Sequence, residues 1–516
     1  MLRGRKSPEE RLREELSAGA SQVKTLDFRG YEDCNVIEEY EVDSFGIVSK
    51  VRVAEKGGEG FYLVQEPSLQ EDEVKGFQII ASLVSSSGEF AQLRSREEYE
   101  AKIVEIVQSK KDVLGVKISD DRVRLVAKMV AREVLGYGVI DTPMSDENVS
   151  DVACPSHLTG VIVKHRSYPD FGWMRTNISL QREELDLLVQ KIAGRFGKEL
   201  SVMVPKAEIT TDDGSRIMLT YKTEISKPSS SLSIRKFPKS PWSIVKLVSL
   251  HSLSPTMAAY LWYLVDKKRF LIISGPMGSG KTTLLGALLS LINTSYAVCT
   301  CEDTAELSLP AQFKWFRLMT RKAGVFGAKE SEVSLYDLVM LSLRTGADYV
   351  VVGEVRGAEI QALVQAAGTG MGCATTFHAD SFANLISRMK GRPLSVDDSF
   401  LMTIGSICFV GTIPIGQEKK MGRRVIRIEE PVWDGELKPK TVFTLDPSKD
   451  VFEPNSVKEA VENSVRLKEI AEFTKEDPVE ELSKRKKVIE EALERKLFTS
   501  EELANFLNRK RREMRF

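Results

Sequence analysis

Residues 271–283 read L-I-I-S-G-P-M-G-S-G-K-T-T and constrain the fold more than any other stretch of the chain. An apolar run, Leu271–Ile273, precedes the spacing G-x-x-x-x-G-K-T of residues 275–282, and leucines at helical intervals follow. This order predicts a strand, a phosphate-binding loop and a helix. The alternating strands and helices that follow predict a parallel sheet covered by helices. We therefore expect an α/β nucleotide-binding domain around this segment.

Each residue type in this loop has a physical role toward a nucleotide. Glycines let consecutive backbone N–H groups turn toward the β-phosphate, and the next helix presents its positive N-terminus to the same anion. Lys281 is expected to reach the β- and γ-phosphates, and the hydroxyl of Thr282 is expected to bind Mg²⁺. The predicted cofactors are ATP and Mg²⁺, and the predicted nucleotide-binding residues are Gly275, Gly278, Ser279, Gly280, Lys281, Thr282 and Thr283.

Length, charge and cysteine usage exclude several classes of protein. The chain has 516 residues, enough for about three domains. It holds 73 Lys and Arg residues against 74 Asp and Glu residues, so bulk attraction to nucleic acid is not expected. The charged N-terminus does not resemble a signal peptide, and no apolar run of about 18 residues predicts a membrane span. Six scattered cysteines without a C-x-x-C pair make a zinc site unexpected and indicate a reduced, cytoplasmic protein.

Hydrophobic periodicity divides the chain into five expected segments. Alternating and then helical patterns predict an N-terminal strand and helical module over residues 1–135. Short strands with one helix predict an α+β lobe over residues 136–236. A two-proline linker over 237–242 leads to an α/β domain over 243–445, and a charged helical segment occupies 446–516.

Local signals add detail to this division. The apolar run 401–416 is interrupted by two glycines and a proline and predicts two buried strands. Residues 477–480 and 499–502 read as capping boxes that begin two C-terminal helices. Leu503, Phe506 and Leu507 form one apolar stripe, which we expect to pack within its own domain.

Two acidic residues are expected at strand ends beside the phosphate-binding loop. Glu302 follows the strand expected over 296–300, and Glu354 follows the strand expected over 348–352. Carboxylates at the carboxyl ends of parallel strands lie at the edge where open α/β sheets bind ligands. Either carboxylate could hold Mg²⁺ or orient the attacking water, and the sequence leaves the choice of base between them open.

A further predicted strand ends in a histidine. Three glycines within residues 368–372 precede an apolar-to-polar strand that ends at His378. A lone histidine is more often structural than catalytic. Beside a phosphate-binding loop, however, His378 could sense the γ-phosphate and pass that state to a subunit contact.

Four motifs together resemble those of the type II/IV secretion ATPases. They are a Walker A motif over 275–282, an Asp box over 302–306, a Walker B motif over 353–357 and a His box over 368–378. The resemblance covers roughly residues 130–430. The segment Tyr62–Pro67 and the lack of a C-x-x-C insertion resemble the archaeal branch, which includes pilus, secretion and archaellum motor ATPases.

The resemblance implies both a fold and a machine. It implies a RecA-like P-loop domain with a separate α+β N-terminal domain, a homo-hexamer ring, and an integral membrane platform protein as partner. The ring would hydrolyse ATP in the cytoplasm, at the inner face of the membrane, to power secretion, pilus assembly or archaellum rotation. Catalytic arginines would complete the site across lobes or subunits, and the matching positions are Arg216, Arg235 and Arg344. A cation that arrives on closure neutralises charge on the transferred phosphoryl group.

Two alternatives from other classes stay open. A RecA-like ring that translocates nucleic acid finds its best support in basic clusters at 484–487 and 509–512. The interspersed glutamates and the near-zero net charge disfavour it, so no nucleic-acid partner is expected. A non-hydrolysing nucleotide scaffold is disfavoured by the intact Walker A lysine and the two strand-end carboxylates.

Overall fold

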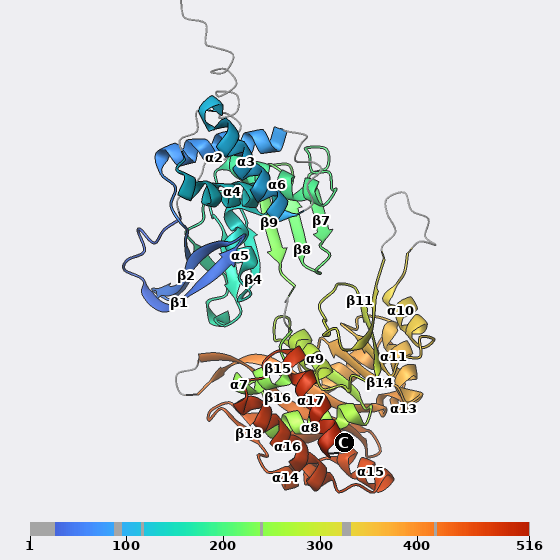
Figure 1. Cartoon of the computed structure of the whole chain (residues 1–516). Coiled ribbons are helices and arrows are strands. Elements are labelled where there is room, and N and C mark those ends of the chain that lie inside the picture. The colour runs from blue at the N-terminus through green and yellow to red at the C-terminus, as the bar shows by residue number, and fades with distance from the viewer. Residues whose placement is uncertain are drawn as a thin grey trace, which may run out of the picture. The chain divides into compact units, whose positions relative to one another are not determined.

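The computed structural model describes residues 26–86, 95–114, 118–237, 241–321, 332–416 and 420–514. Contacts within the chain divide it into two compact units, Met1–Pro238 and Lys239–Phe516. Each unit contains one large β-sheet (Figure 1). The finer division into five segments stays a prediction. In the described part of the chain, no helix is both long and apolar enough to cross a membrane.

The N-terminal unit is built on a sheet in which nine strands of the described residues follow the order β1-β2-β3-β6-β5-β4-β9-β8-β7. Neighbouring strands are antiparallel except β3 and β6, whose parallel pairing joins strands from either side of residue 136 in one sheet. The strands are β1 (Asn35–Ser44), β2 (Ile47–Lys56), β3 (Glu59–Gln65), β4 (Val149–Cys154), β5 (Ile162–His165), β6 (Met174–Thr176), β7 (Lys206–Thr210), β8 (Arg216–Thr220) and β9 (Ser231–Arg235).

Helices of this unit bury one face each, in two separate clusters. Helix α6 begins at a capping box on Gln181 and buries Leu185, Val189 and Ile192 against the sheet at helical spacing. Helices α2, α3 and α4 form the second cluster with Ile47 of β2. The helices are α2 (Glu71–Ser86), α3 (Arg96–Leu114), α4 (Asp120–Leu135), α5 (Asp141–Ser145) and α6 (Arg182–Arg195), with short 3₁₀ turns η2 (Gly138–Ile140) and η3 (Pro169–Phe171).

The C-terminal unit contains the phosphate-binding loop on a sheet whose described strands follow the order β12-β11-β13-β14-β10-β15-β16-β17-β18. The first six of these strands are parallel and the rest are antiparallel. The strands are β10 (Phe270–Ser274), β11 (Ala297–Glu302), β12 (Lys314–Met319), β13 (Tyr349–Val352), β14 (Gly372–Phe377), β15 (Ile404–Ile415), β16 (Lys420–Trp433), β17 (Leu437–Asp446) and β18 (Val451–Glu453).

Helices cover both faces of this sheet. Leu271 and Ile273 of β10 pack with α7, α8, α9 and the C-terminal helices, while Phe270 and Ile272 pack with α10, α11 and α12 on the other face. A strand buried on both faces reads as a continuous apolar run, which is the pattern seen in the sequence. The predicted fold class, a RecA-like α/β domain with a separate α+β N-terminal domain, is confirmed. The helices are α7 (Ile244–Ser249), α8 (Pro255–Asp266), α9 (Lys281–Leu289), α10 (Leu335–Ser342), α11 (Glu359–Gly368), α12 (Phe382–Lys390) and α13 (Asp398–Leu401), followed by α14 (Val457–Asn463), α15 (Val465–Thr474), α16 (Pro478–Glu494) and α17 (Ser500–Met514).

The C-terminal helices, red in Figure 1, belong to the core of the C-terminal unit. Asp266, at the end of α8, lies 2.9 Å from Arg485 of α16 and 3.0 Å from Arg511 of α17. The predicted capping box at the start of α17 is confirmed by reciprocal bonds between Thr499 and Glu502. At the start of α16 only half of the predicted box is seen, because Asp477 accepts from the backbone N–H of Val479 at 2.8 Å whereas Glu480 pairs with Lys484. The predicted apolar stripe of α17 is buried in the same cluster as α8, in agreement with its expected packing.

One predicted break in the sheet is wrong. Residues 401–416 do not form two strands, because β15 runs unbroken from Ile404 to Ile415. A Cβ at Gly405 would lie 2.8 Å from the side chain of Arg269, and a Cβ at Gly411 would lie 2.6 Å from Cδ1 of Ile426. Both glycines therefore permit close packing and do not mark turns.

Candidate nucleotide-binding site

The phosphate-binding loop connects β10 to α9 and approaches β15 closely. Gly275 has a φ of 156°, and a Cβ there would lie 2.2 Å from the carbonyl oxygen of Val410, so no side chain fits. Gly280, with a φ of 95°, is the N-cap of α9. Lys281 is buried at the first position of the helix, Thr282 is half-buried and Thr283 is exposed. All seven predicted nucleotide-binding residues lie in this loop and the first turn of α9.

Lys281, His378 and Glu354 form a continuous chain of contacts at the loop. Nζ of Lys281 donates to the carbonyl oxygen of Pro276 at 2.9 Å and lies 3.2 Å from Nδ1 of His378. Nε2 of His378 lies 2.8 Å from Oε1 of Glu354, and Oε2 of Glu354 accepts from Arg356 at 2.7 Å. An ammonium group has only donors, so Nδ1 of His378 accepts. The ring proton of the neutral imidazole is then on Nε2, which lies 2.8 Å from Oε1 of Glu354 but does not make a well-aligned hydrogen bond to it.

The charges of this chain of contacts set the protonation of its members. Burial lowers the pKa of His378, and the charge of Lys281 adds to this effect against the opposing charge of Glu354. Burial acts to raise the pKa of Glu354, but the hydrogen bond and charge of Arg356, with His378 and Lys281, hold that pKa below its usual value. At neutral pH we therefore expect a neutral His378 beside an ionised Glu354.

Glu302 ends β11 in a different environment. It is buried, with 1% of its surface exposed, and its Oε1 accepts from the backbone N–H groups of Glu306 and Leu307, both at 2.8 Å. Its Oε2 has no hydrogen-bond partner among the described residues. Burial outweighs the two N–H donors and raises the pKa of Glu302 to about 7. A Cβ at Gly353 would lie 3.2 Å from Cγ of Glu302, so the glycine leaves room for this carboxyl group beside β13.

The oxygen donors around the loop suit Mg²⁺ unequally. Mg²⁺ prefers hard oxygen ligands, and the hydroxyl of Thr282 and the ionised carboxylate of Glu354 are of that kind. Glu302 fits less well, because two backbone N–H groups already use Oε1 and only Oε2 is left without a partner among the described residues. Thr282 and Glu354 are therefore the better pair to hold the metal, directly or through water.

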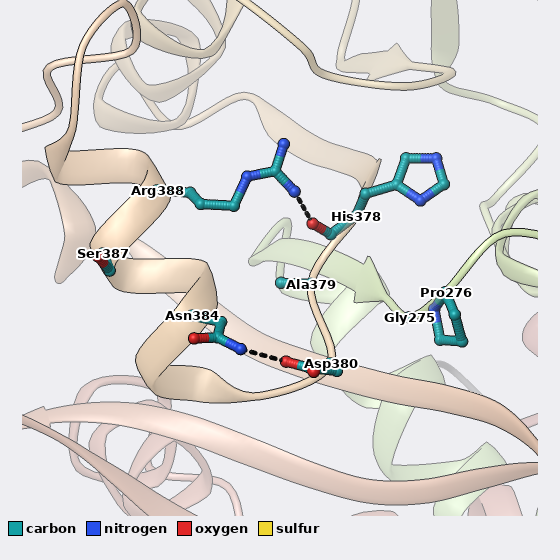
Figure 2. A pocket seen from close by; sticks show the side chains of 8 residues that line it. All are labelled: Gly275, Pro276, His378, Ala379, Asp380, Asn384, Ser387 and Arg388. Atoms are coloured by element: carbon teal, nitrogen blue, oxygen red, sulfur yellow. Dashed lines mark hydrogen bonds between the residues drawn. The ribbon is translucent and has the colours of Figure 1, made fainter.

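A cavity of about 390 Å³ opens beside the start of the loop (Figure 2). Arg388 of α12 donates to the carbonyl oxygen of His378, and Asn384 donates to Asp380 at 2.5 Å. Polar side chains of α12 therefore surround the approach to the phosphate-binding loop. The lining residues are Gly275, Pro276, His378, Ala379, Asp380, Asn384, Ser387 and Arg388.

The three predicted arginines lie elsewhere in the chain. Arg216 and Arg235 are paired neighbours on β8 and β9 of the N-terminal unit, and the side chain of Arg235 is 64% exposed and 3.1 Å from Asp151. Arg344 precedes the amino end of β13, whereas Glu354 follows its carboxyl end. The four residues of β13 put about 13 Å between these edges of the sheet. Arg344 therefore lies at the edge opposite the phosphate-binding loop.

Four arginines close to the loop are missing from the sequence-based site. Arg356 bonds to the carboxylate of the Walker B motif, and its place two residues later in that motif could have indicated this role. Arg388 and Arg427 bond to the backbone after β14, 10 and 47 residues from their partners, and no local pattern links them. Arg423 of β16 lies beside the loop, with its Cδ 3.9 Å from the position of a Cβ at Gly280.

Comparison with solved structures finds weak overall likeness. The pilus retraction motor PilT with bound ADP has a TM-score of 0.39 and 18% sequence identity, over 63% of this chain and 85% of PilT. The ATPase DotB of Legionella pneumophila has a TM-score of 0.38 and 19% identity, over 67% of this chain and 84% of DotB.

Comparison of sequences is more informative. The family described as Type II/IV secretion system protein matches residues 212–402. The uncharacterized protein MJ0900 of Methanocaldococcus jannaschii is 30% identical over 465 residues, 85% of this chain and 82% of that relative. A putative conjugal transfer protein of Mycobacterium tuberculosis is 26% identical over 287 residues, 53% of this chain and 77% of that relative. With its phosphate-binding loop intact, the chain belongs to the type II/IV secretion system ATPase family and is a P-loop ATPase.

Proposed function

We propose that this chain is the ATPase subunit of a homo-hexamer that powers a secretion, pilus-assembly or archaellum machine through an integral membrane platform protein. It would act in the cytoplasm, at the inner face of the membrane. The observation that carries the proposal is the chain of contacts from Lys281 through His378 to Glu354, since it joins the phosphate-binding group to a charged carboxylate. A scaffold that only binds nucleotide has no need of that carboxylate.

The side chains at the loop divide the work of hydrolysis. Lys281 neutralises charge on the β- and γ-phosphates. Thr282 and Glu354 would hold Mg²⁺, which would supply further charge neutralisation when bound. Glu354, whose pKa is lowered, accepts a hydrogen bond from the attacking water and orients it. His378 lies against the Glu354 carboxylate, with Nε2 2.8 Å from Oε1, and limits the directions that the carboxylate can take. Glu302 remains the second candidate for the base.

The arginines are proposed to complete the site between lobes or subunits. Arg235 is exposed enough to leave Asp151, since an exposed ion pair contributes little. Arg216 is the second candidate from the N-terminal unit. Arg344 lies at the sheet edge away from its own loop, so it can act only toward another subunit. A guanidinium that arrives on closure stabilises the transferred phosphoryl group and makes hydrolysis depend on assembly.

The nucleic-acid alternative loses its best support in the C-terminal helices. Lys484 pairs with Glu480 and Glu481, and Lys510 pairs with Glu491. Arg485 and Arg511 are buried beside Asp266. These side chains of the two basic clusters are therefore neutralised within the unit and do not form a free basic surface.

The test measures ATPase activity against protein concentration, with the size of the particle followed by analytical ultracentrifugation. Specific activity should rise as hexamers form, and Arg235→Ala should lose activity while it still binds nucleotide. Vesicles of acidic lipid should change the rate more than duplex or single-stranded DNA does. Full activity in a sample shown to be monomeric, or stimulation by DNA alone, would contradict the proposal.

A further inference from the structure

Three consecutive backbone carbonyl groups follow β14, and each accepts a hydrogen bond from a side chain of a different element. This arrangement begins at His378 and holds the loop that enters α12. We call the three donors the carbonyl clamp: Arg388 of α12 donates to His378, Ser274 of β10 donates to Ala379 at 2.7 Å, and Arg427 of β16 donates to Asp380 at 3.0 Å.

The two arginines of the clamp are themselves held in place. The guanidinium of Arg388 lies 5.0 Å from the ring centroid of Phe377, and Figure 2 shows its hydrogen bond to the carbonyl oxygen of His378. The guanidinium of Arg427 lies 4.6 Å from the ring centroid of Phe409 and 3.1 Å from Glu429. Packing on an aromatic ring restricts the orientation of a guanidinium group. Each arginine is therefore already directed toward the carbonyl group to which it donates.

The loop needs this rigidity because of what His378 does. Its imidazole accepts from Lys281 at one nitrogen and contacts Glu354 at the other, 3.2 Å and 2.8 Å away. Both distances hold for one ring orientation only, and the contact with the Lys281 ammonium requires the tautomer in which Nδ1 accepts. A loop backbone that was free to turn would lose one of the two contacts. Water could satisfy the carbonyl groups, but it would not fix their direction.

We propose that Ser274, Arg388 and Arg427 are positioning residues that set the orientation and tautomer of His378 for hydrolysis. The inference rests on the proposed function, in which His378 directs the carboxylate of Glu354. In these three hydrogen bonds each side chain donates to a backbone oxygen and not to the reacting phosphate. Their effect is on the geometry of the base.

The kinetic test compares Arg388→Ala, Arg427→Ala and Ser274→Ala with the full-length wild type. We expect kcat to fall about 10- to 100-fold for the arginine variants, with KM for ATP changed by less than about threefold, because phosphate binding is retained. Arg388→Lys keeps one donor and should recover part of the loss. Lys390→Ala is the matched control, since Lys390 lies on the same helix and pairs with Asp398.

A second readout is independent of ATP hydrolysis. The chain has only four histidines, so selective ¹⁵N-histidine labelling gives a simple imidazole spectrum, in which His378→Asn assigns the signal. Wild-type His378 should show the Nε2–H tautomer, and Arg388→Ala should show a mixture.

The outcomes separate the inference from the proposed function. Wild-type tautomer and wild-type kcat in both arginine variants would overturn the clamp. A parallel rise in KM would also overturn it, because the residues would then act on nucleotide binding. If the arginine variants fail to fold, Ser274→Ala, which removes a single oxygen, decides by the same spectrum. A changed spectrum in a protein without ATPase activity would keep the clamp and reject the proposed function.

Discussion

Glu302 ends β11 and Glu354 follows β13, and these two strands are hydrogen-bonded neighbours. The first carboxyl group is buried beneath two backbone N–H donors, and its pKa is raised to about 7. The second has 27% of its side chain exposed and contacts Arg356 and His378, and its pKa is lowered. Adjacent strand ends of one sheet thus hold one acid that resists ionisation and one that favours it.

The difference teaches that position at the sheet edge does not fix the role of an acid. Solvent access and the nearest cation decide its charge at neutral pH. An ionised group can orient water or bind Mg²⁺, whereas a buried group whose Oε1 already accepts two backbone N–H bonds mainly supports the loop around it. The comparison therefore favours Glu354 as the base, and four predictions test it.

Lys281→Ala is expected to have the largest effect, because it removes the cation beside Glu354 at the phosphate-binding loop. Hydrolysis should be abolished and ATP binding weakened, as the main fixed charge at the β- and γ-phosphates is lost. Steady-state phosphate release and nucleotide titration measure the two effects. Near-wild-type turnover would show that the phosphate-binding loop takes no part in hydrolysis, and the comparison of Glu302 with Glu354 would then say nothing about the mechanism.

Glu354→Gln separates the two acids. The variant keeps the shape of the side chain and should still bind ATP, while kcat falls about 10²- to 10⁴-fold because the carboxylate is lost. Glu302→Gln should reduce kcat far less. The two variants serve as each other's control in single-turnover measurements. If Glu302→Gln is instead the inactive variant, Glu302 of the Asp box is the base.

Stability against pH tests the burial of Glu302. Its folded pKa is about 7 and its ordinary value is 4.5, so the folded state holds the proton more tightly. The contribution of Glu302 to the free energy of unfolding is therefore fully present below pH 4.5. It is lost as the pH rises toward 7, which lowers the free energy of unfolding by at most about 3 kcal/mol. In urea unfolding, the wild type should lose more stability between pH 5 and pH 8 than Glu302→Gln. If the free energy of unfolding depends on pH in the same way in both proteins, the ionisation of Glu302 destabilises the folded state little.

Arg356→Ala should have the smallest effect. Arg356 lowers the pKa of Glu354, so its removal raises that pKa and moves the acidic limb of the activity profile to higher pH. Because both groups are partly exposed, the expected shift is less than about one pH unit. Lys390→Ala serves as the control outside this contact, since Lys390 pairs with Asp398. An unchanged acidic limb would mean that Glu354 does not set it.

Much of the fold could be predicted from local pattern. The apolar runs of β10 and β13 are buried on both faces, as such runs predict. A glycine-rich loop between a strand and a helix has few functions other than phosphate binding. The two acids could not be distinguished, because the burial of Glu302 depends on the glycine at 353 and on the turn of the following loop. Arg388 and Arg427 reach the site only through tertiary packing, and the glycines of β15 could not be told from turn residues.

The contacts of Asp266 have a consequence for how the chain is made. Helix α8 lies near the start of the C-terminal unit, whereas its partners Arg485 and Arg511 lie on the last helices of the described chain. During synthesis, α8 and its apolar neighbours leave the ribosome long before those partners exist. Such long-range closure is slow and leaves apolar surface open meanwhile. A nascent chain that stops before α17 would present an unfinished core to chaperones and proteases, so this ATPase unit can close only after α17 has been made.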